Sequence, residues 1–109
     1  MITGAASGIG RALAEGLARE GARLVLADVD EAGLQAACAA LAARGTAAVA
    51  VRTDVSERGQ VLALADRAWD AFGAVHILSN NAGVSTWGGL EAASHRDWQW
   101  VLGVNLWGV

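Results

Sequence analysis

The alternation of short apolar segments with longer helical segments is the feature that most constrains the fold of this chain. The runs LVLA at 24–27 and AVAV at 48–51 do not alternate polar with apolar residues, which is typical of strands in a sheet covered on both faces. Strands are predicted at residues 1–3, 23–28, 47–53 and 75–80, and helices at residues 9–19, 30–43, 56–72 and 94–109. Helices between successive strands imply parallel strands joined by right-handed crossovers. We therefore expect an α/β fold of the Rossmann type, a doubly wound parallel sheet, in one domain over residues 1–109.

The two ends of this pattern are incomplete. Residues 1–3 resemble the end of a strand, and the helix predicted at 94–109 has no following strand to which it returns. We therefore expect an incomplete sheet, with a truncated first strand and without its C-terminal strands, in the N-terminal part of a larger protein. The first strand should be central, so its truncation would expose the edges of its neighbours. We expect the isolated chain to be poorly stable or to aggregate.

Composition excludes several classes of function. The net charge is −3, and the eight basic residues, all Arg, are spread along the chain, so no basic patch for nucleic acid is expected. No apolar run approaches the length that spans a bilayer, and no signal peptide precedes the first glycines, so no membrane association is expected. The only cysteine, Cys38, has no partner for an internal disulfide. These features together predict a cytoplasmic protein.

A glycine-rich turn lies between the first predicted strand and the first helix. Gly4, Gly8 and Gly10 would let backbone N–H groups approach a pyrophosphate, and the helix N-terminus favours its negative charge. The same spacing also occurs in ordinary turns, because 14 of the 109 residues are glycine. The context strengthens the cofactor interpretation: Asp28 ends the second strand, where a carboxylate accepts hydrogen bonds from a ribose diol. Together these residues predict half of a dinucleotide site.

The residues around Asp28 favour NAD over NADP. A carboxylate at this position suits a free 2′-hydroxyl and repels a 2′-phosphate. No arginine stands nearby to bind that phosphate, because Val29 follows Asp28 and Ser7 precedes Gly8.

Polar residues also follow the third and fourth predicted strands. Asp54 comes after the third strand, where it either begins the next helix or contributes to a cofactor site. The sequence NNAG at 80–83 closes the fourth strand and is either a simple turn or part of a ligand site. Ligands bind at the carboxyl ends of strands in parallel sheets, which is where both segments are expected.

Side chains suggest how the later helices begin and pack. Asp30 and Ser56 are the expected N-caps of the second and third helices. One face of the last helix carries Trp98, Val101, Leu102 and Asn105, and another carries Trp100, Val104 and Trp107. A helix that is apolar on most sides is usually buried, so we expect it against the sheet, with a second subunit as a further candidate. An asparagine there needs a partner for its amide, and the simplest is a neighbouring backbone group.

These motifs, taken in order, resemble those of the short-chain dehydrogenases/reductases. The matching segments are TGAASGIG at 3–10, Asp28, DV at 54–55, NNAG at 80–83 and VNLWGV at 104–109. The resemblance covers essentially the whole chain and about half or less of the family's domain. None of these motifs is specific to the family by itself, whereas the set in this order is highly specific to it.

The resemblance implies a role for each matching residue. Gly4, Gly8 and Gly10 would form the coenzyme turn, with Ser7 and Ile9 near the phosphates and ribose, and Asp28 would hold the adenosine ribose. Asp54 and Val55 would flank the adenine, and Asn81, Ala82 and Gly83 would pack beside the cofactor. Asn105 would match the family's catalytic asparagine, which holds a water in a proton relay. No metal is implied.

Family members transfer a hydride between nicotinamide and an alcohol or carbonyl carbon, using a Tyr as acid/base together with a Lys and a Ser. This chain contains no Tyr and no Lys, so we expect an NAD-dependent oxidoreductase as the parent protein and no activity in the 109-residue chain itself. The resemblance also implies a small alcohol or ketone substrate and a homodimer or homotetramer when the protein is complete. The alternative is a non-catalytic module that binds or senses NAD, with the Trp-rich last helix as a partner surface.

Overall fold

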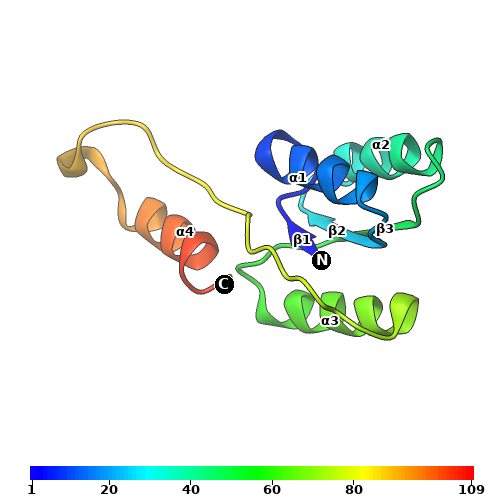
Figure 1. Ribbon diagram of the computed structural model, residues 1–109. Helices are drawn as coiled ribbons and strands as arrows, with labels where there is room; N and C mark the ends of the chain where they lie inside the picture. Colours follow the sequence, from blue (N-terminus) through cyan, green and yellow to red (C-terminus); the bar gives the residue numbers. More distant parts are fainter.

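A three-stranded parallel sheet forms the centre of the molecule (Figure 1). The computed structural model describes all 109 residues. The strands β1 (Ile2–Thr3), β2 (Leu24–Asp28) and β3 (Ala48–Arg52) lie in the order β1-β2-β3. The helices α1 (Gly8–Arg19) and α2 (Glu31–Ala42) cover one face of the sheet, and α3 (Arg58–Phe72) covers the other (Figure 1). This arrangement confirms the predicted α/β fold with parallel strands, in its incomplete form.

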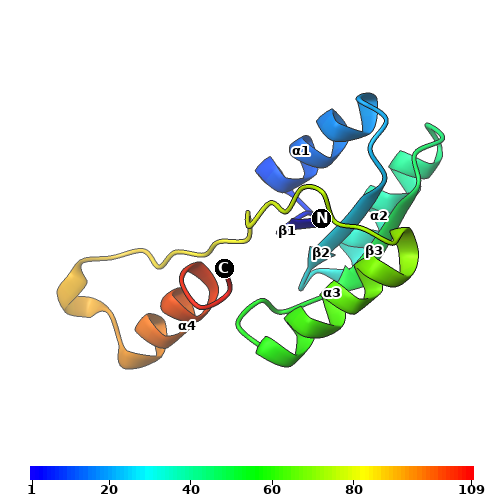
Figure 2. The ribbon, with the colours of Figure 1, turned by 60° about the horizontal axis from the view of Figure 1, so that its bottom comes forward.

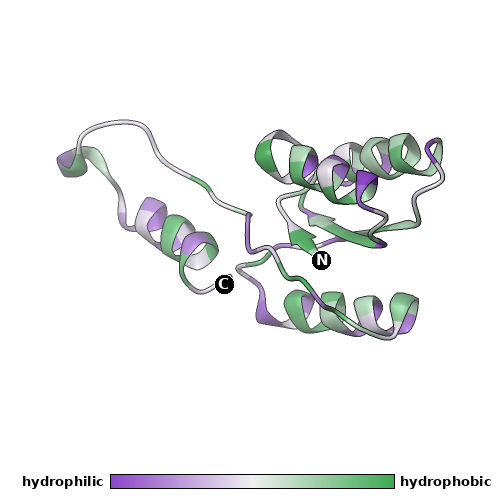
Figure 3. Cartoon of the chain, viewed as in Figure 1, coloured by the Kyte–Doolittle hydropathy of each residue, from purple (hydrophilic) through white to green (hydrophobic).

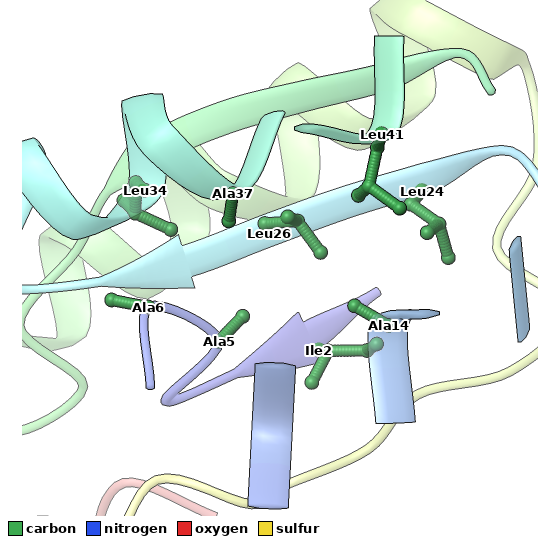
Figure 4. Packing of buried hydrophobic residues seen from close by; sticks show 9 residues of the cluster. All are labelled: Ile2, Ala5, Ala6, Ala14, Leu24, Leu26, Leu34, Ala37 and Leu41. Carbon is green, nitrogen blue, oxygen red and sulfur yellow. The ribbon is translucent and has the colours of Figure 1, made fainter. Parts of the chain in front are cut away.

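The central strand β2 explains the lack of alternation in the sequence LVLA, because its side chains enter two separate cores. Leu24 and Leu26 pack in a cluster beneath α1 and α2, which Figure 4 shows in detail. Val25 and Ala27 pack on the opposite face against residues of α3. Since successive side chains of a strand point to opposite faces, a strand buried on both sides must be apolar throughout.

The prediction of a strand at 75–80 was wrong in its extent. Only one parallel bridge forms, between Ile2 and Ser79. The Thr3 N–H donates to the Ser79 carbonyl at 3.0 Å, and the Ser79 N–H donates to the Met1 carbonyl at 2.9 Å. The segment thus lies beside β1, where a fourth strand would lie, but the two residues of β1 offer too few backbone groups for a longer ladder.

Helix N-caps agree with the prediction in α2 and differ from it in α3. Asp30 caps α2 by accepting a hydrogen bond from the Gly33 N–H at 3.0 Å, as expected. The N-cap of α3 is Glu57 and not Ser56. Ser56 instead lies in the turn before the helix, where its hydroxyl donates to Asp54 Oδ1 at 2.6 Å.

The last helix, α4 (His95–Asn105), follows the short 3₁₀ helix η1 (Leu90–Ala92) and ends earlier than the predicted residue 109. Ser94 and Asp97 form a capping box at its start. At its end, the N–H groups of Leu106 and Trp107 both donate to the Leu102 carbonyl, and the chain turns away.

The expected burial of α4 against the sheet was also wrong, whereas burial against a second subunit stays a prediction. Val104 is its only buried residue, whereas Trp98 is 45% exposed and, just beyond the helix, Trp107 is 77% exposed. Figure 2 shows α4 beside the layered part and not against a face of the sheet. Figure 3 shows that its hydrophobic stretches lie outside the two cores. The apolar pattern predicted an apolar surface correctly, but the sheet of this chain does not cover it. None of the helices is long and apolar enough to cross a bilayer.

Candidate functional site

A cavity of about 300 Å³ opens where the strands of the sheet end. Most of the residues predicted for the cofactor line it, namely Gly4, Ser7, Asp28, Asp54, Val55, Asn81, Ala82 and Gly83. Its other lining residues are Val29, Thr53, Val84, Trp100 and Val104. Gly8, Ile9, Gly10 and Asn105 do not line it. The topology thus brings together segments that are far apart in the sequence, because the carboxyl ends of parallel strands share one edge.

The three glycines of the turn serve different structural needs. Gly4 and Gly8 have φ angles of 65° and 51°, in the left-handed region that favours glycine. A Cβ at Gly10 would collide with the Gly4 carbonyl oxygen and lie 2.6 Å from Asn81 Nδ2, whereas a Cβ at Gly8 would meet nothing within 4 Å. Gly10 is therefore required for close packing, and Gly8 only for its backbone conformation.

The N-terminus of α1 is open toward solvent. Its N-cap, Ser7, makes no side-chain hydrogen bond to the first turn, and that turn contains no acidic residue. Ile9 in the same turn is largely exposed. Backbone N–H groups of the first turn therefore lack a capping side chain, and such groups together with the helix dipole attract an anion.

Asn81 and Thr3 join the segment after residue 80 to the glycine turn. The Asn81 side-chain amide donates to the carbonyls of Thr3 and Gly4 at 3.0 and 3.2 Å. The Thr3 hydroxyl accepts from the N–H groups of Asn81 and Ala82 at 3.1 and 3.0 Å. Sequence reasoning missed Thr3; its signal is a hydroxyl residue at the end of a buried strand, immediately before the first glycine of the turn.

Asp28 is held by backbone donors at the edge of the cavity. Its Oδ2 accepts from the Ala6 N–H at 3.0 Å, and its Oδ1 accepts from the Asp30 N–H at 3.1 Å. A carboxylate has about four lone-pair positions, so two bonds leave capacity for hydroxyl donors of a ligand. The carboxylate is thereby fixed in orientation and still able to bind.

Asp54 organises the start of α3, the first of the two alternatives considered for it, and the cofactor role stays a prediction. Its Oδ1 accepts from the Ser56 N–H at 2.9 Å, and its own N–H donates to Gln60 Oε1 at 2.9 Å, so it organises the start of α3. It also lines the cavity beside Val55. Val55 is buried and lies close to Gly108, where a Cβ would come within 2.8 Å of Val55 Cγ2.

Asn105 forms the backbone hydrogen bonds that were considered for it. Its Oδ1 accepts from the Val84 N–H at 2.9 Å, and its Nδ2 donates to the Val84 carbonyl at 2.8 Å. The residue is exposed and lines a neighbouring cavity of about 420 Å³ together with Ser85, Thr86 and Trp98. Asn105 thus joins the end of α4 to the loop at Val84, which lines the cavity at the strand ends.

Replacing Asn105 with alanine should release this loop. Loss of the paired hydrogen bonds should cost about 1 kcal/mol in local stability, which corresponds to roughly fivefold faster hydrogen exchange of the Val84 amide. Exchange measured by NMR on Asn105→Ala, with the exposed Asn80→Ala as the control, tests this. Unchanged exchange at Val84 would contradict it.

Comparison with known proteins places this geometry among dehydrogenases. A family model described as short chain dehydrogenase matches residues 1–109. The chain is 56% identical to a short chain dehydrogenase/reductase from Burkholderia phymatum, solved in complex with NAD, with a TM-score of 0.96 over 98% of this chain and 38% of that one. An alcohol dehydrogenase from Thermococcus sibiricus, complexed with 5-hydroxy-NADP, is 32% identical, with a TM-score of 0.94 over 98% of this chain and 46% of that one.

Curated relatives agree with the solved structures. The chain is 43% identical over 109 residues to the putative oxidoreductase SadH of Mycobacterium tuberculosis, covering 100% of this chain and 40% of the relative. The chain therefore spans about 40% of the length of that relative.

Proposed function

The chain belongs to the short-chain dehydrogenase family, and from this premise we propose that it forms the dinucleotide-binding part of an oxidoreductase acting on an alcohol or carbonyl group. The single observation that carries this proposal is the cavity at the carboxyl edge of the sheet, which gathers eight of the residues predicted for the cofactor. Its lining comes from the ends of all three strands, from the segment after residue 80 and from α4.

The residues around the cavity fit a nicotinamide dinucleotide. The uncapped first turn of α1 suits a pyrophosphate, and the absence of side chains at Gly4 and Gly10 lets the turn pack closely on Asn81. Asp28 retains acceptor capacity for a ribose diol. When bound, the nicotinamide would supply the hydride donor or acceptor. The residues of this chain would bind and orient the cofactor.

We propose that NAD is preferred over NADP. Support comes from the charge of Asp28 and from its hydrogen bond to Ala6, which holds the carboxylate beside the turn. Solved relatives include both an NAD complex and a complex with an NADP derivative. The preference therefore depends on the residues of this chain, and a fixed carboxylate at the ribose position opposes a 2′-phosphate.

Calorimetric titration of the purified chain tests both the binding and the preference. We expect NAD to bind at least about tenfold more tightly than NADP, because repulsion between two anions near the protein surface exceeds 1.4 kcal/mol. Asp28→Asn keeps an oxygen acceptor and removes the charge, so it should bring the two affinities within about threefold.

Asp30→Asn is the matched control for this titration. It removes the same charge two residues away, and asparagine caps a helix as well as aspartate does. NADP binding by the original chain as tight as NAD binding would refute the preference. The absence of any dinucleotide binding would refute the proposed function.

We propose that catalysis belongs to the complete protein. This chain contains neither Tyr nor Lys, so it lacks the acid/base pair that a short-chain dehydrogenase uses. Asn105 is our candidate for the catalytic asparagine of the whole enzyme, and the chain alone should bind a dinucleotide without turnover. We further propose that the complete protein is a homodimer or homotetramer in the cytoplasm. The exposed apolar residues Leu106 and Trp107, just beyond α4, support the oligomer.

A further inference from the structure

Trp100 lines the dinucleotide cavity, although no motif of the sequence pointed to it. It lies one helical turn before Val104 on α4, and both residues contribute to the same cavity wall. Trp100 is 48% exposed, so it is neither buried in a core nor fully exposed to solvent. An indole in this position presents a large flat apolar surface to whatever occupies the cavity.

The covalent order of a dinucleotide determines which of its parts lies near Trp100; this step rests on the proposed function. The phosphate belongs at the first turn of α1, and the adjacent ribose belongs at Asp28. The sheet order β1-β2-β3 places Asp28 between the glycine turn and the end of β3. The base attached to that ribose must therefore lie on the far side of Asp28, toward the end of β3 and α4.

The lining on that side suits a flat aromatic base. It consists of Val29, Val55, Val104 and Trp100, beside the single carboxylate of Asp54. No cationic side chain lines the cavity, so a phosphate or another anion would find no partner at this end. Branched apolar side chains and an indole can instead cover the two faces of a purine.

We propose that Trp100 forms one wall of the adenine site and determines much of the affinity for the adenosine half of the cofactor. Stacking between a base and an aromatic side chain contributes free energy without requiring particular hydrogen bonds. The indole reaches the site from α4, a helix whose other tryptophan is placed differently. Trp98 is 45% exposed on the same helix but lines the neighbouring cavity of Ser85 and Thr86. Trp98 is therefore a matched control.

Calorimetric titration with ADP-ribose, which contains adenine, and nicotinamide mononucleotide, which does not, tests the proposal. Trp100→Ala should weaken ADP-ribose binding about tenfold, the effect of removing one stacking aromatic. Nicotinamide mononucleotide should bind equally to Trp100→Ala and the original chain, and Trp98→Ala should leave ADP-ribose binding unchanged. Equal ADP-ribose affinity in Trp100→Ala and the original chain would overturn the proposal, as would an equal loss in Trp98→Ala.

A conservative variant and a fluorescence measurement distinguish the loss of stacking from a folding defect in Trp100→Ala. Trp100→Phe keeps an aromatic ring, so ADP-ribose should bind within about threefold of the original affinity. The quenching of tryptophan emission by ADP-ribose should persist in Trp98→Phe and disappear in Trp100→Phe. Persistent quenching in Trp100→Phe would overturn the adenine assignment while leaving dinucleotide binding intact. Failure of the original chain to bind ADP-ribose or NAD would overturn both proposals.

Discussion

Replacing Gly10 with alanine is expected to abolish the folded dinucleotide-binding turn. The new Cβ would overlap the Gly4 carbonyl oxygen and lie 2.6 Å from Asn81 Nδ2. The obstacle is backbone and a hydrogen-bonded amide, so neither can move aside without breaking the contacts of Asn81 with the turn. We expect a loss of about 3 kcal/mol or more in the free energy of unfolding, together with loss of NAD binding. Urea denaturation followed by circular dichroism measures the first effect, and calorimetry the second.

Gly8→Ala is the matched control for this substitution. Unlike Gly10, Gly8 has a left-handed φ, and a Cβ there would meet nothing within 4 Å. Its cost should therefore be only the conformational penalty of about 1 kcal/mol for an L-residue in that region. Equal stability losses in Gly8→Ala and Gly10→Ala would contradict the close-packing constraint at Gly10.

Replacing Thr3 with valine is expected to produce the second largest effect. Thr3 is 5% exposed, and its hydroxyl accepts hydrogen bonds from two backbone N–H groups, those of Asn81 and Ala82. Valine has nearly the same shape but no acceptor, so both donors would lose this partner in a partly buried place. Each unsatisfied group costs about 1–3 kcal/mol, so we expect a loss of roughly 2–4 kcal/mol in the free energy of unfolding.

Two variants separate this hydroxyl effect from the effect of substitution at a buried position. Thr3→Ser keeps the acceptor and should lose less than about 1.5 kcal/mol, the cost of one methyl group. Thr53→Val alters an equally buried threonine, 2% exposed, whose hydroxyl only donates to the Val51 carbonyl at 3.1 Å. It should cost about 1 kcal/mol or less. If urea denaturation shows that Thr3→Val lowers the free energy of unfolding no more than Thr53→Val does, the assigned role of Thr3 is contradicted.

The helices and strands were predictable where local signals agreed with the packing. The apolar run of β2, the N-cap Asp30 and the glycine turn each follow from residues within a few positions of one another. The errors occurred where a partner distant in the sequence decides the outcome. Residues 75–80 form one bridge because β1 offers two residues for pairing. The N-cap of α3 is the exception, because Ser56 bonds to Asp54 only two positions away.

The burial of α4 shows the same limit more clearly. Its apolar residues predict that its surface is covered, but they do not predict which segment covers it. In this chain the helix is fastened through Val104 and through the bonds of Asn105 to Val84, while Trp98 and Trp107 remain exposed. The apolar pattern of a helix reports its preference for burial, whereas the burial itself depends on a surface brought to it by other segments.

The sequence by itself determined the family and the α/β alternation. It also predicted the chemistry at the strand ends, because glycines and a carboxylate act through their own conformational freedom and charge. Only the tertiary structure decided which residues share the cavity. It added Trp100 and Val104 to the wall, excluded Gly8, Ile9, Gly10 and Asn105 from it, and gave Thr3 its role. The physical reason is that cavities and buried hydrogen bonds join groups separated by tens of residues, and their distances depend on how every intervening element packs.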